Sequence, residues 1–368
     1  MKLRNKIFIG VATVFVLAFP ALLITAGHDS PCPPVVALMD EKPMRAAMRR
    51  CYGVPQGLRV ERIAKPIPRD DQVLIEVRAS SVNPSEWFGV TGQPQVIRLF
   101  NDGIGRPGTT RVGYDMAGIV EAAGANVTLF KPGDEVFGGV GGALADYVVA
   151  REQGAIIIKP ENLSFEEAAA IPIAAITALQ GLRDHGHIAA GKKVLINGAS
   201  GGVGTYAVQI AKALGAEVTG VCSTRNVELV RSLGAAHVVD YTQADFTEGE
   251  ARYDLILDNI GNHGFSDLAD VLKPDGVIVV VGGQKNGTFL GPIKRVVWSK
   301  IAGLFVEPKL TFFIASVNKA DLELLAGLAR EGRLKSVIDR RYPLEEAGAA
   351  LEYLGGGHAR GKVVVTIH

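Results

Sequence analysis

The chain has 368 residues, of which 48% are hydrophobic, and its 39 basic and 38 acidic residues leave a formal net charge of +1. This length suffices for two domains and an extension, and the balanced charge, with no basic stripe, excludes a nucleic-acid-binding surface. The three cysteines, Cys32, Cys51 and Cys222, are dispersed and odd in number, which predicts neither a disulfide framework nor a zinc cluster. We interpret Cys51 and Cys222 as small buried apolar residues.

The first predicted element is an apolar segment near the N-terminus. Lys2, Arg4 and Lys6 precede residues 7–27, which are 21 uncharged positions. As a helix they would span about 31 Å, close to the hydrocarbon thickness of a bilayer. We favour an uncleaved membrane anchor over a cleaved signal peptide, because a signal peptide usually has a shorter apolar core. Residues 28–43, with four prolines, form a predicted linker that completes an N-terminal segment, 1–43.

From residue 44 to about residue 170 the pattern predicts a β-rich domain. Residues 72–78 partly alternate between apolar and polar, as a half-buried strand does, and residues 114–123 form another apolar stretch. Residues 131–137 are typical of a turn that enters a strand. We expect the strands of residues 44–170 to close on themselves as a barrel-like domain.

From about residue 171 strands alternate with helices, which predicts an α/β fold with a doubly wound parallel sheet over residues 171–312. The predicted strands are 194–197, 217–222, 237–241, 255–260 and 277–281. The predicted helices are 205–215, 226–233 and 264–272. Residues 313–368 are expected to return to the first domain. They contain predicted helices near 320–330 and 344–354 and a final strand at 362–367.

A glycine-dense turn follows the first of these strands, in Val194-Leu-Ile-Asn-Gly-Ala-Ser-Gly-Gly-Val-Gly204. Small residues let backbone N–H groups approach a dinucleotide pyrophosphate, and the helix N-terminus adds partial positive charge. Ala199, Gly201 and Gly204 occupy the three small-residue positions of the dinucleotide-binding fingerprint. Because the flanking strand and helix are also present, we predict a dinucleotide-binding loop. Its residues are Ser200, Gly201, Gly202, Val203 and Gly204.

Several motifs, occurring in order, carry a resemblance to a known family. Gly113-Tyr-Asp-Met-Ala-Gly-Ile-Val120 and Lys131-Pro-Gly-Asp-Glu-Val136 resemble the medium-chain dehydrogenase/reductase superfamily. The glycine loop and Ser81-Val-Asn-Pro84 resemble its zinc-independent quinone oxidoreductase branch, and Gly361-Lys-Val-Val364 matches the terminal strand of that branch. Over residues 44–368 the chain is similar to the reticulon-interacting mitochondrial oxidoreductases. The resemblance implies a GroES-like catalytic domain followed by a Rossmann domain.

The residues themselves argue against a zinc site. Zinc alcohol dehydrogenases use thiolate and imidazole ligands, three from the protein in a catalytic site and four in a structural one. No histidine occurs between His28 and His185, and Tyr114 stands where zinc-dependent relatives carry a histidine. We interpret His185 and His187 as residues of a solvated loop and predict no metal.

The end of the second predicted strand indicates which nicotinamide cofactor is used. NAD-specific folds usually place Asp or Glu there to bind the ribose hydroxyls, but this chain has Cys222-Ser-Thr-Arg225. The hydroxyl of Ser223 and the guanidinium of Arg225 suit a 2′-phosphate, so we predict NADPH. The alternative is that Arg225 only solvates the start of a helix.

The resemblance implies further cofactor contacts. They are Tyr241 and Arg360 at the 2′-phosphate, Thr177 near the nicotinamide ribose and phosphate, and Phe313 along the nicotinamide. Asn259 and Gly282 follow predicted strands, and ligands of such sheets bind at the carboxyl ends of strands. For Phe313 the alternative is an apolar strand in the core.

Hydride transfer is the chemistry of the cofactor, while the protein orients the acceptor and excludes water. Without zinc, a carbonyl must be polarised by hydrogen-bond donors. This favours quinones, enones and enals, because their negative charge delocalises onto an oxygen that a donor can reach. Asn83 is our first candidate for the polar group that faces the nicotinamide and substrate. Tyr114 is the second, as donor or pocket wall, with the alternative that its phenol only hydrogen-bonds in the core. We interpret Asp115 as structural.

The sequence thus predicts an NADPH-dependent, zinc-independent reductase of quinones or activated alkenes, bound to a membrane through residues 7–27. The alternatives are an alcohol or aldehyde oxidoreductase and a non-catalytic NADPH-binding sensor or membrane scaffold. A homodimer is left open. The basic residues before the span favour an exported domain, whereas cofactor supply favours the cytoplasmic face. Cleavage of a signal peptide would export the chain.

Overall fold

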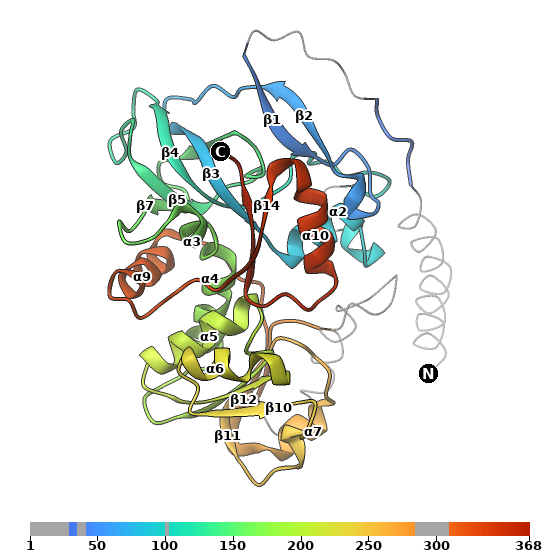
Figure 1. The fold of residues 1–368 in the computed structure, drawn as a ribbon, viewed down its shortest axis with the longest axis vertical. Helices are drawn as coiled ribbons and strands as arrows, with labels where there is room; N and C mark the ends of the chain where they lie inside the picture. The colour runs from blue at the N-terminus through green and yellow to red at the C-terminus, as the bar shows by residue number, and fades with distance from the viewer. Residues whose placement is uncertain (1–28, 35–41, 100–102, 284–308) are drawn as a thin grey trace, which may run out of the picture.

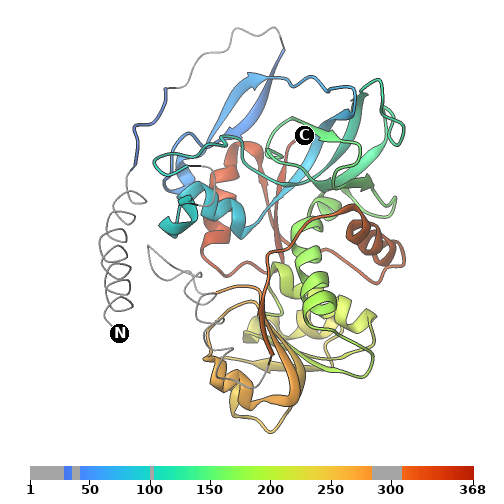
Figure 2. The same ribbon diagram turned by 180° about the vertical axis from the view of Figure 1, so that it is seen from behind.

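The structure is a computed structural model that describes residues 29–34, 42–99, 103–283 and 309–368. Most strands belong to two large sheets, which Figures 1 and 2 show as two lobes stacked along the long axis of the molecule. We call them the seven-stranded lobe and the six-stranded lobe. Helices α4 (Pro172–Gln180) and α5 (Gly202–Ala213) lie between the two sheets.

The seven-stranded lobe has a mostly antiparallel sheet in the order β14-β15-β3-β4-β5-β7, with β6 paired to β3. Its strands are β3 Gln72–Val82, β4 Asp115–Ala123, β5 Glu135–Gly139, β6 Tyr147–Arg151, β7 Ile156–Ile158, β14 Ile338–Pro343 and β15 Lys362–Thr366. A separate hairpin pairs β1 (Pro43–Met48) with β2 (Arg59–Ala64). Val73, Ile75 and Val77 alternate along β3 and are buried in the core of this lobe, as a period of two requires.

The six-stranded lobe has a fully parallel sheet in the order β10-β9-β8-β11-β12-β13. Its strands are β8 Lys193–Asn197, β9 Glu217–Cys222, β10 His237–Asp240, β11 Tyr253–Asp258, β12 Leu272–Val280 and β13 Lys309–Phe312. The strand order reverses direction between β8 and β11, which is where open α/β sheets bind ligands. The predicted α/β class, a β-rich part joined to a doubly wound parallel sheet, is confirmed.

The other helices cover the sheets or close the connections between strands. The α-helices are α2 Pro84–Thr91, α3 Phe165–Ala169, α6 Val227–Ser232, α7 Phe265–Asp270, α9 Lys319–Arg330 and α10 Ala347–Gly355. The short 3-10 and π turns are η1 Pro55–Gly57, η2 Gln95–Leu99, η3 Gly181–His185, η4 Thr224–Asn226, η5 Phe246–Glu248 and η6 Leu344–Glu346.

Some helices and strands end at other residues than predicted, because pairing between strands determines where they end. The strand predicted at 72–78 continues to Val82, because its last residues pair with both β4 and β15. The helix predicted at 264–272 ends at Asp270, because Leu272 already pairs with Tyr253 of β11. Sheet partners that are distant in sequence set these ends, and local periodicity does not reveal them.

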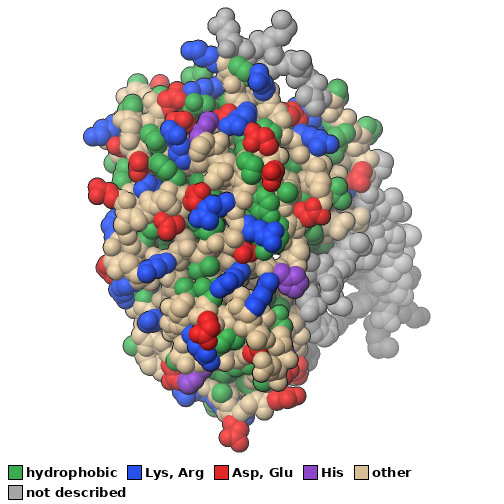
Figure 3. All heavy atoms as spheres, in the orientation of Figure 1, with side chains coloured by type: hydrophobic (Ala, Val, Ile, Leu, Met, Phe, Trp, Pro, Cys, Tyr) green, Lys and Arg blue, Asp and Glu red, His purple; other side chains and the backbone are tan. Residues whose placement is uncertain are grey.

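One apolar core continues from one lobe into the other. It includes Ala117 and Phe137 of the seven-stranded sheet, Leu179 of α4, and Val194 and Ile196 of β8. Burial of this shared surface removes apolar area from water, so packing holds the lobes in place. On the face seen in Figure 3, basic and acidic side chains are interspersed, in keeping with the balanced net charge.

The predicted membrane anchor at residues 7–27 lies outside the described residues. Within the parts of the chain that the structure describes, every helix is too short or too polar to cross a bilayer.

The prediction that the cysteines form no disulfide was wrong. Cys32 and Cys51 are bridged, with their Cα atoms 5.5 Å apart, and only Cys222 is the small buried residue we expected. Residues 29–34 run alongside the seven-stranded lobe, where Asp29 pairs with Arg98 at 2.7 Å. This path brings the two cysteines together, and their spacing in the sequence gives no sign of it.

Replacing both Cys32 and Cys51 with Ser should lower the free energy of unfolding by about 3 kcal/mol, because the bridge closes a loop with a sequence separation of 19 residues. Thermal unfolding of the full chain with and without reducing agent measures this effect. Cys222→Ser is the matched control, and it should keep the sensitivity of the wild type to reductant. A wild-type midpoint that reductant leaves unchanged would show that the bridge does not form in solution.

Candidate active site

The glycine loop lies at the carboxyl end of β8 and opens α5. Gly198 has a positive φ of 79°, which turns the chain sharply after the strand. A Cβ on Gly204 would lie 2.1 Å from the carbonyl oxygen of Gly198, so only glycine lets the helix pack this closely on the turn. The N–H groups of the first helical turn have no partner within the helix and can bind an anion. The loop therefore has the shape predicted for a dinucleotide site.

The terminal segment of the chain contacts this loop from the other lobe. Gly361 donates its N–H to the carbonyl of Ser200 at 2.8 Å and forms a parallel bridge with Gly201. A Cβ on Gly202 would lie 3.4 Å from Lys362 Cδ. The last strand of the seven-stranded lobe thus starts against the glycine loop. Because we predict that residues 200–204 of this loop bind the pyrophosphate, we call them the phosphate loop.

The end of β9 places a second polar group beside the loop. Asn226 donates to Ser200 Oγ at 3.1 Å and to Ser223 Oγ at 3.2 Å, and its own Oδ1 is buried with no hydrogen-bond partner. The exposed Arg225 donates to the carbonyl of His358 at 2.9 Å, near the terminal strand. Sequence reasoning named Ser200, Ser223 and Arg225 but missed Asn226, which joins the loop to the end of β9.

The other predicted cofactor residues are dispersed around the two sheets. Tyr241 is 56% exposed, and Arg360 is exposed, with its backbone N–H donating to Asp339. Thr177 Oγ1 donates to the carbonyl of Ile173 at 2.7 Å. None of these contacts tests their predicted roles toward a cofactor.

Two further predicted residues follow the central strands of the parallel sheet. Asn259 donates from Nδ2 to the carbonyl of Asn197 at 2.8 Å, while its Oδ1 is buried and has no partner. A Cβ on Gly282 would lie 2.2 Å from the carbonyl oxygen of Asn259. Phe313 stacks on His185 with ring centroids 4.3 Å apart and packs on the shared core. Phe313 is partly buried and lies one residue beyond β13, and these contacts do not test its predicted role along the nicotinamide.

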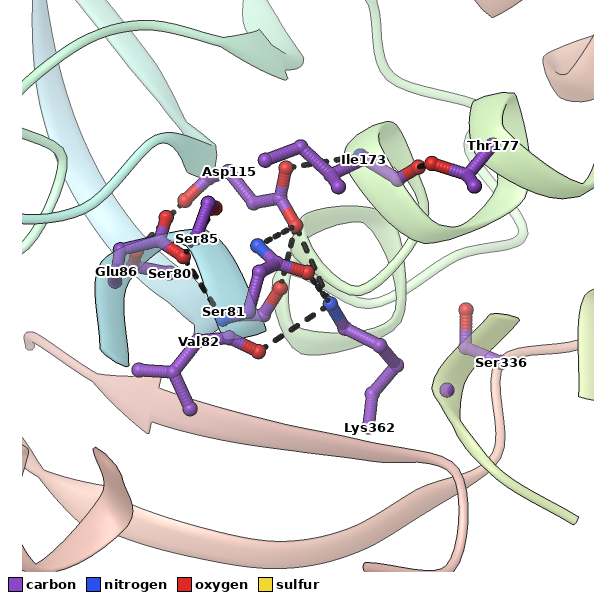
Figure 4. A network of polar contacts seen from close by, with 12 residues as sticks. Ser80, Ser81, Val82, Ser85, Glu86, Asp115, Ile173, Thr177, Ser336 and Lys362 are labelled. Carbon is purple, nitrogen blue, oxygen red and sulfur yellow. Dashed lines mark hydrogen bonds and ion pairs between the residues drawn. The ribbon is translucent and has the colours of Figure 1, made fainter. Parts of the chain in front are cut away.

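A buried polar network lies where the two lobes meet (Figure 4). The Asp115 carboxylate is fully buried, and its Oδ2 accepts from Ser81 Oγ at 2.8 Å and from Asn83 Nδ2 at 2.9 Å. Its Oδ1 accepts from the backbone N–H of Ile173 in the first turn of α4, at 3.0 Å. Lys362 Nζ lies 3.4 Å from Oδ2. This arrangement gives Asp115 the structural role that we predicted.

Asn83, our first catalytic candidate, lies inside this network and is 2% exposed. Its Oδ1 accepts from Lys362 Nζ, and its Nδ2 donates to Asp115. An asparagine amide has two N–H donors, and one of them is bonded to Asp115. That Asn83 faces substrate stays a prediction. Tyr114 is half-buried, and its ring would be 2.3 Å from a Cβ on Gly139, which shows why glycine stands there.

Sequence reasoning missed Lys362 and Glu86 as members of this site. Lys362 is 3% exposed. The sequence feature that could have identified it is a lysine at the first position of an otherwise apolar terminal strand. Glu86 follows Asn83 at the start of α2, and its Oε2 accepts the Asn83 backbone N–H at 3.0 Å. Burial and the neighbouring charge of Asp115 raise the pKa of Glu86 to about 7.

Glu86→Gln should make the stability of the protein less dependent on pH, because Gln keeps the acceptor for the Asn83 N–H but cannot ionise. The pKa of Glu86 is about 7 in the folded protein and 4.5 ordinarily. The contribution of Glu86 to the free energy of unfolding is therefore fully present below pH 4.5 and is lost as the pH rises to 7. Between these limits the wild type should lose up to about 3 kcal/mol relative to the variant. Denaturant unfolding across this range measures the difference, and parallel curves would refute the raised pKa.

Comparison with known proteins identifies the family. Residues 69–161 match the alcohol dehydrogenase GroES-like domain, and residues 233–365 match a family described as zinc-binding dehydrogenase. The chain is 34% identical to a chloroplast envelope quinone oxidoreductase homolog of Arabidopsis thaliana, covering 89% of this chain and 99% of that protein. The chain belongs to the quinone oxidoreductase branch of the medium-chain dehydrogenase/reductase superfamily. It is an oxidoreductase that uses a nicotinamide cofactor and acts on a small molecule.

Other members of the superfamily agree. The mouse (Mus musculus) mitochondrial NAD(P)H oxidoreductase RTN4IP1 is 34% identical, over 81% of this chain and 82% of that protein. The 2-methylene-furan-3-one reductase of Solanum lycopersicum is 32% identical, over 88% of this chain and 79% of that protein. The solved quinone oxidoreductase of Coxiella burnetii superimposes with a TM-score of 0.77 at 31% identity, covering 89% of this chain and all of that one.

The name of one matching family refers to zinc, so the available ligands matter. In residues 29–34, 42–99, 103–283 and 309–368, no three His, Cys, Asp or Glu side chains are grouped so that they could hold a metal ion. Tyr114 stands at the position where we noted a histidine in zinc-dependent relatives, and Cys51 is bonded to Cys32. A metal-free reaction stays a prediction.

Proposed function

We propose that this oxidoreductase is an NADPH-dependent, zinc-independent reductase of quinones or activated alkenes. The observation that carries the proposal is the buried Asn83 carboxamide, held by Asp115 and Lys362 beside the strand that contacts the phosphate loop. It offers a preorganised N–H donor at the junction of the lobes. Relatives named as a quinone oxidoreductase homolog and a furanone reductase support this acceptor class.

The residues at the carboxyl edge of the parallel sheet fit a dinucleotide. The close packing at Gly204 leaves the first turn of α5 open to a pyrophosphate, and two buried oxygens, Asn226 Oδ1 and Asn259 Oδ1, have no protein partner. Residues 222–226 contain no acid to bind ribose hydroxyls, and the guanidinium of Arg225 is exposed. We therefore favour NADPH over NADH.

We assign the predicted contacts to three parts of the proposed cofactor. The pyrophosphate would be bound by Ser200, Gly201, Gly202, Val203 and Gly204. The 2′-phosphate would be bound by Ser223, Arg225, Tyr241 and Arg360. The nicotinamide side would be lined by Thr177, Asn259, Gly282 and Phe313.

When bound, the reduced nicotinamide supplies a hydride to the acceptor. The second Nδ2 hydrogen of Asn83 donates to the acceptor oxygen, where negative charge develops, and the phenol of Tyr114 is the second donor or the pocket wall. Such donors are effective because they are already oriented and lie in a site of low dielectric constant. The Lys362 cation at Asn83 Oδ1 increases the polarity of the amide and strengthens its N–H as a donor.

The decisive experiment is NADPH oxidation by the full chain against quinones, enones and aldehydes, with NADH as comparison and a chelator as control. We expect turnover on quinone or enone that the chelator does not reduce. Tight NADPH binding without turnover would favour a sensor or scaffold, and turnover on aldehydes alone would favour an alcohol or aldehyde oxidoreductase. A form beginning at residue 29 tests the proposed anchor: it should be slower only on membrane-embedded quinone, and equal rates would exclude a role for residues 7–27.

Arg225→Ala should raise the KM for NADPH about tenfold or more, because a charged hydrogen bond contributes about 1.5–3 kcal/mol, and should leave the KM for NADH unchanged. Arg231→Ala is the matched control, since Arg231 lies on the adjacent α6 and pairs with Glu228 at 2.7 Å. Steady-state kinetics with both cofactors measures the ratio. Equal losses with NADPH and NADH would refute the role at the 2′-phosphate.

A further inference from the structure

Lys362 is a cation in a place where burial is costly. Its side chain is 3% exposed, and Nζ lies 3.4 Å from Asp115 Oδ2 and 3.5 Å from the carbonyl oxygen of Val82, and donates to Asn83 Oδ1. A buried charge needs both a counter-ion and hydrogen-bond partners. An apolar residue of similar length would fill the same space without that cost, so packing alone does not account for a lysine here.

The partners of Lys362 fix the direction of one amide. The carbonyl oxygen of Asn83 faces the cation, and its nitrogen faces the Asp115 carboxylate at 2.9 Å. Rotation of the carboxamide by half a turn would place oxygen against carboxylate and N–H against ammonium, so both contacts would become repulsive. The two charges therefore hold Asn83 in a single orientation, with its second N–H directed away from Asp115.

The residue pair at the start of β15 also reaches the phosphate loop. Gly361 binds the carbonyl of Ser200 at 2.8 Å, and Lys362 Cδ lies against Gly202. Gly361 has a positive φ of 83°, and a Cβ there would lie 2.2 Å from the carbonyl of Val337. This restricts position 361 to glycine. The side chain of the next residue, Lys362, extends toward Asp115 and the carbonyl of Val82 (Figure 4).

We propose that Lys362 is a positioning residue for hydride transfer. It holds the Asn83 carboxamide with its second N–H toward the acceptor oxygen, and it fixes the position of Asn83 relative to the phosphate loop. The proposal rests on the reductase function proposed above. Lys362 acts through Asn83, so its loss should matter only while Asn83 is present.

The test is Lys362→Met alone and combined with Asn83→Ala. Lys362→Met should lower kcat at least tenfold, toward the loss of about 10²–10³ that follows removal of one preorganised donor, and should leave the Kd for NADPH within about twofold, because backbone groups of the loop hold the pyrophosphate. In the Asn83→Ala background the same substitution should have little further effect on kcat. Additive losses would overturn the proposal, because two independent structural roles add.

The matched control is Lys159→Met, which removes a second buried lysine. Lys159 is 6% exposed, pairs with Glu135 at 3.0 Å and donates to the carbonyl of Leu163, away from this network. It should lower thermal stability without changing kcat. If Lys362→Met fails to fold, Asp115→Asn combined with Lys362→Met removes both charges together and should show the same loss of kcat. Unchanged kcat in a folded Lys362 variant would overturn the proposal.

A readout that needs no substrate separates this proposal from the proposed function. In protein labelled with nitrogen-15 asparagine, the Asn83 side-chain amide protons, assigned by their loss in Asn83→Ala, should be widely separated, because only one is bonded to a carboxylate. Lys362→Met should bring the two resonances together, while Lys159→Met should not. Wild type that shows this pattern but reduces no quinone or enone would refute the function and keep the positioning of Asn83. An unchanged pattern in Lys362→Met would refute the positioning.

Discussion

The Asp115 carboxylate is the group on which the junction of the two lobes depends. It accepts hydrogen bonds from Ser81 on β3, from Asn83 at the start of α2 and from the backbone of Ile173 on α4, and it pairs with Lys362 on β15. Its partners are up to 247 residues away in sequence. Because Asp115 is fully buried, water cannot replace a missing donor, so each of the four segments must be in place.

This network contributes more to the relative positions of β15, Asn83 and the glycine loop than to the free energy of unfolding. A buried ion pair roughly balances its desolvation cost, yet removal of one partner alone typically costs about 3–5 kcal/mol, because the other charge is then stranded. Its value here is geometric. By holding the start of β15, the network fixes the position of Gly361 on the phosphate loop, and the same lysine orients Asn83. The glycine loop, which we predict to bind the cofactor, lies in one lobe and Asn83 lies in the other. The neighbouring residues Gly361 and Lys362 contact both of them.

Features set by local sequence were predictable, whereas contacts between distant segments were not. The strand 217–222 has its predicted ends, and the glycine loop was recognised from small residues between a strand and a helix. Lys362 was missed because its partner Asn83 lies 279 residues away, and Glu86 because its raised pKa follows from burial against Asp115. Residue type and spacing do not reveal contacts between residues that are so far apart in the sequence. The path of residues 29–34, which determines the disulfide, was hidden for the same reason.

The bridge between Cys32 and Cys51 bears on where the protein can work. Cytosolic thiols are kept reduced, and disulfides persist in compartments that oxidise them. A chain that keeps this bridge while it works is therefore in an oxidising environment. Reduced nicotinamide would then have to be supplied in that same oxidising compartment.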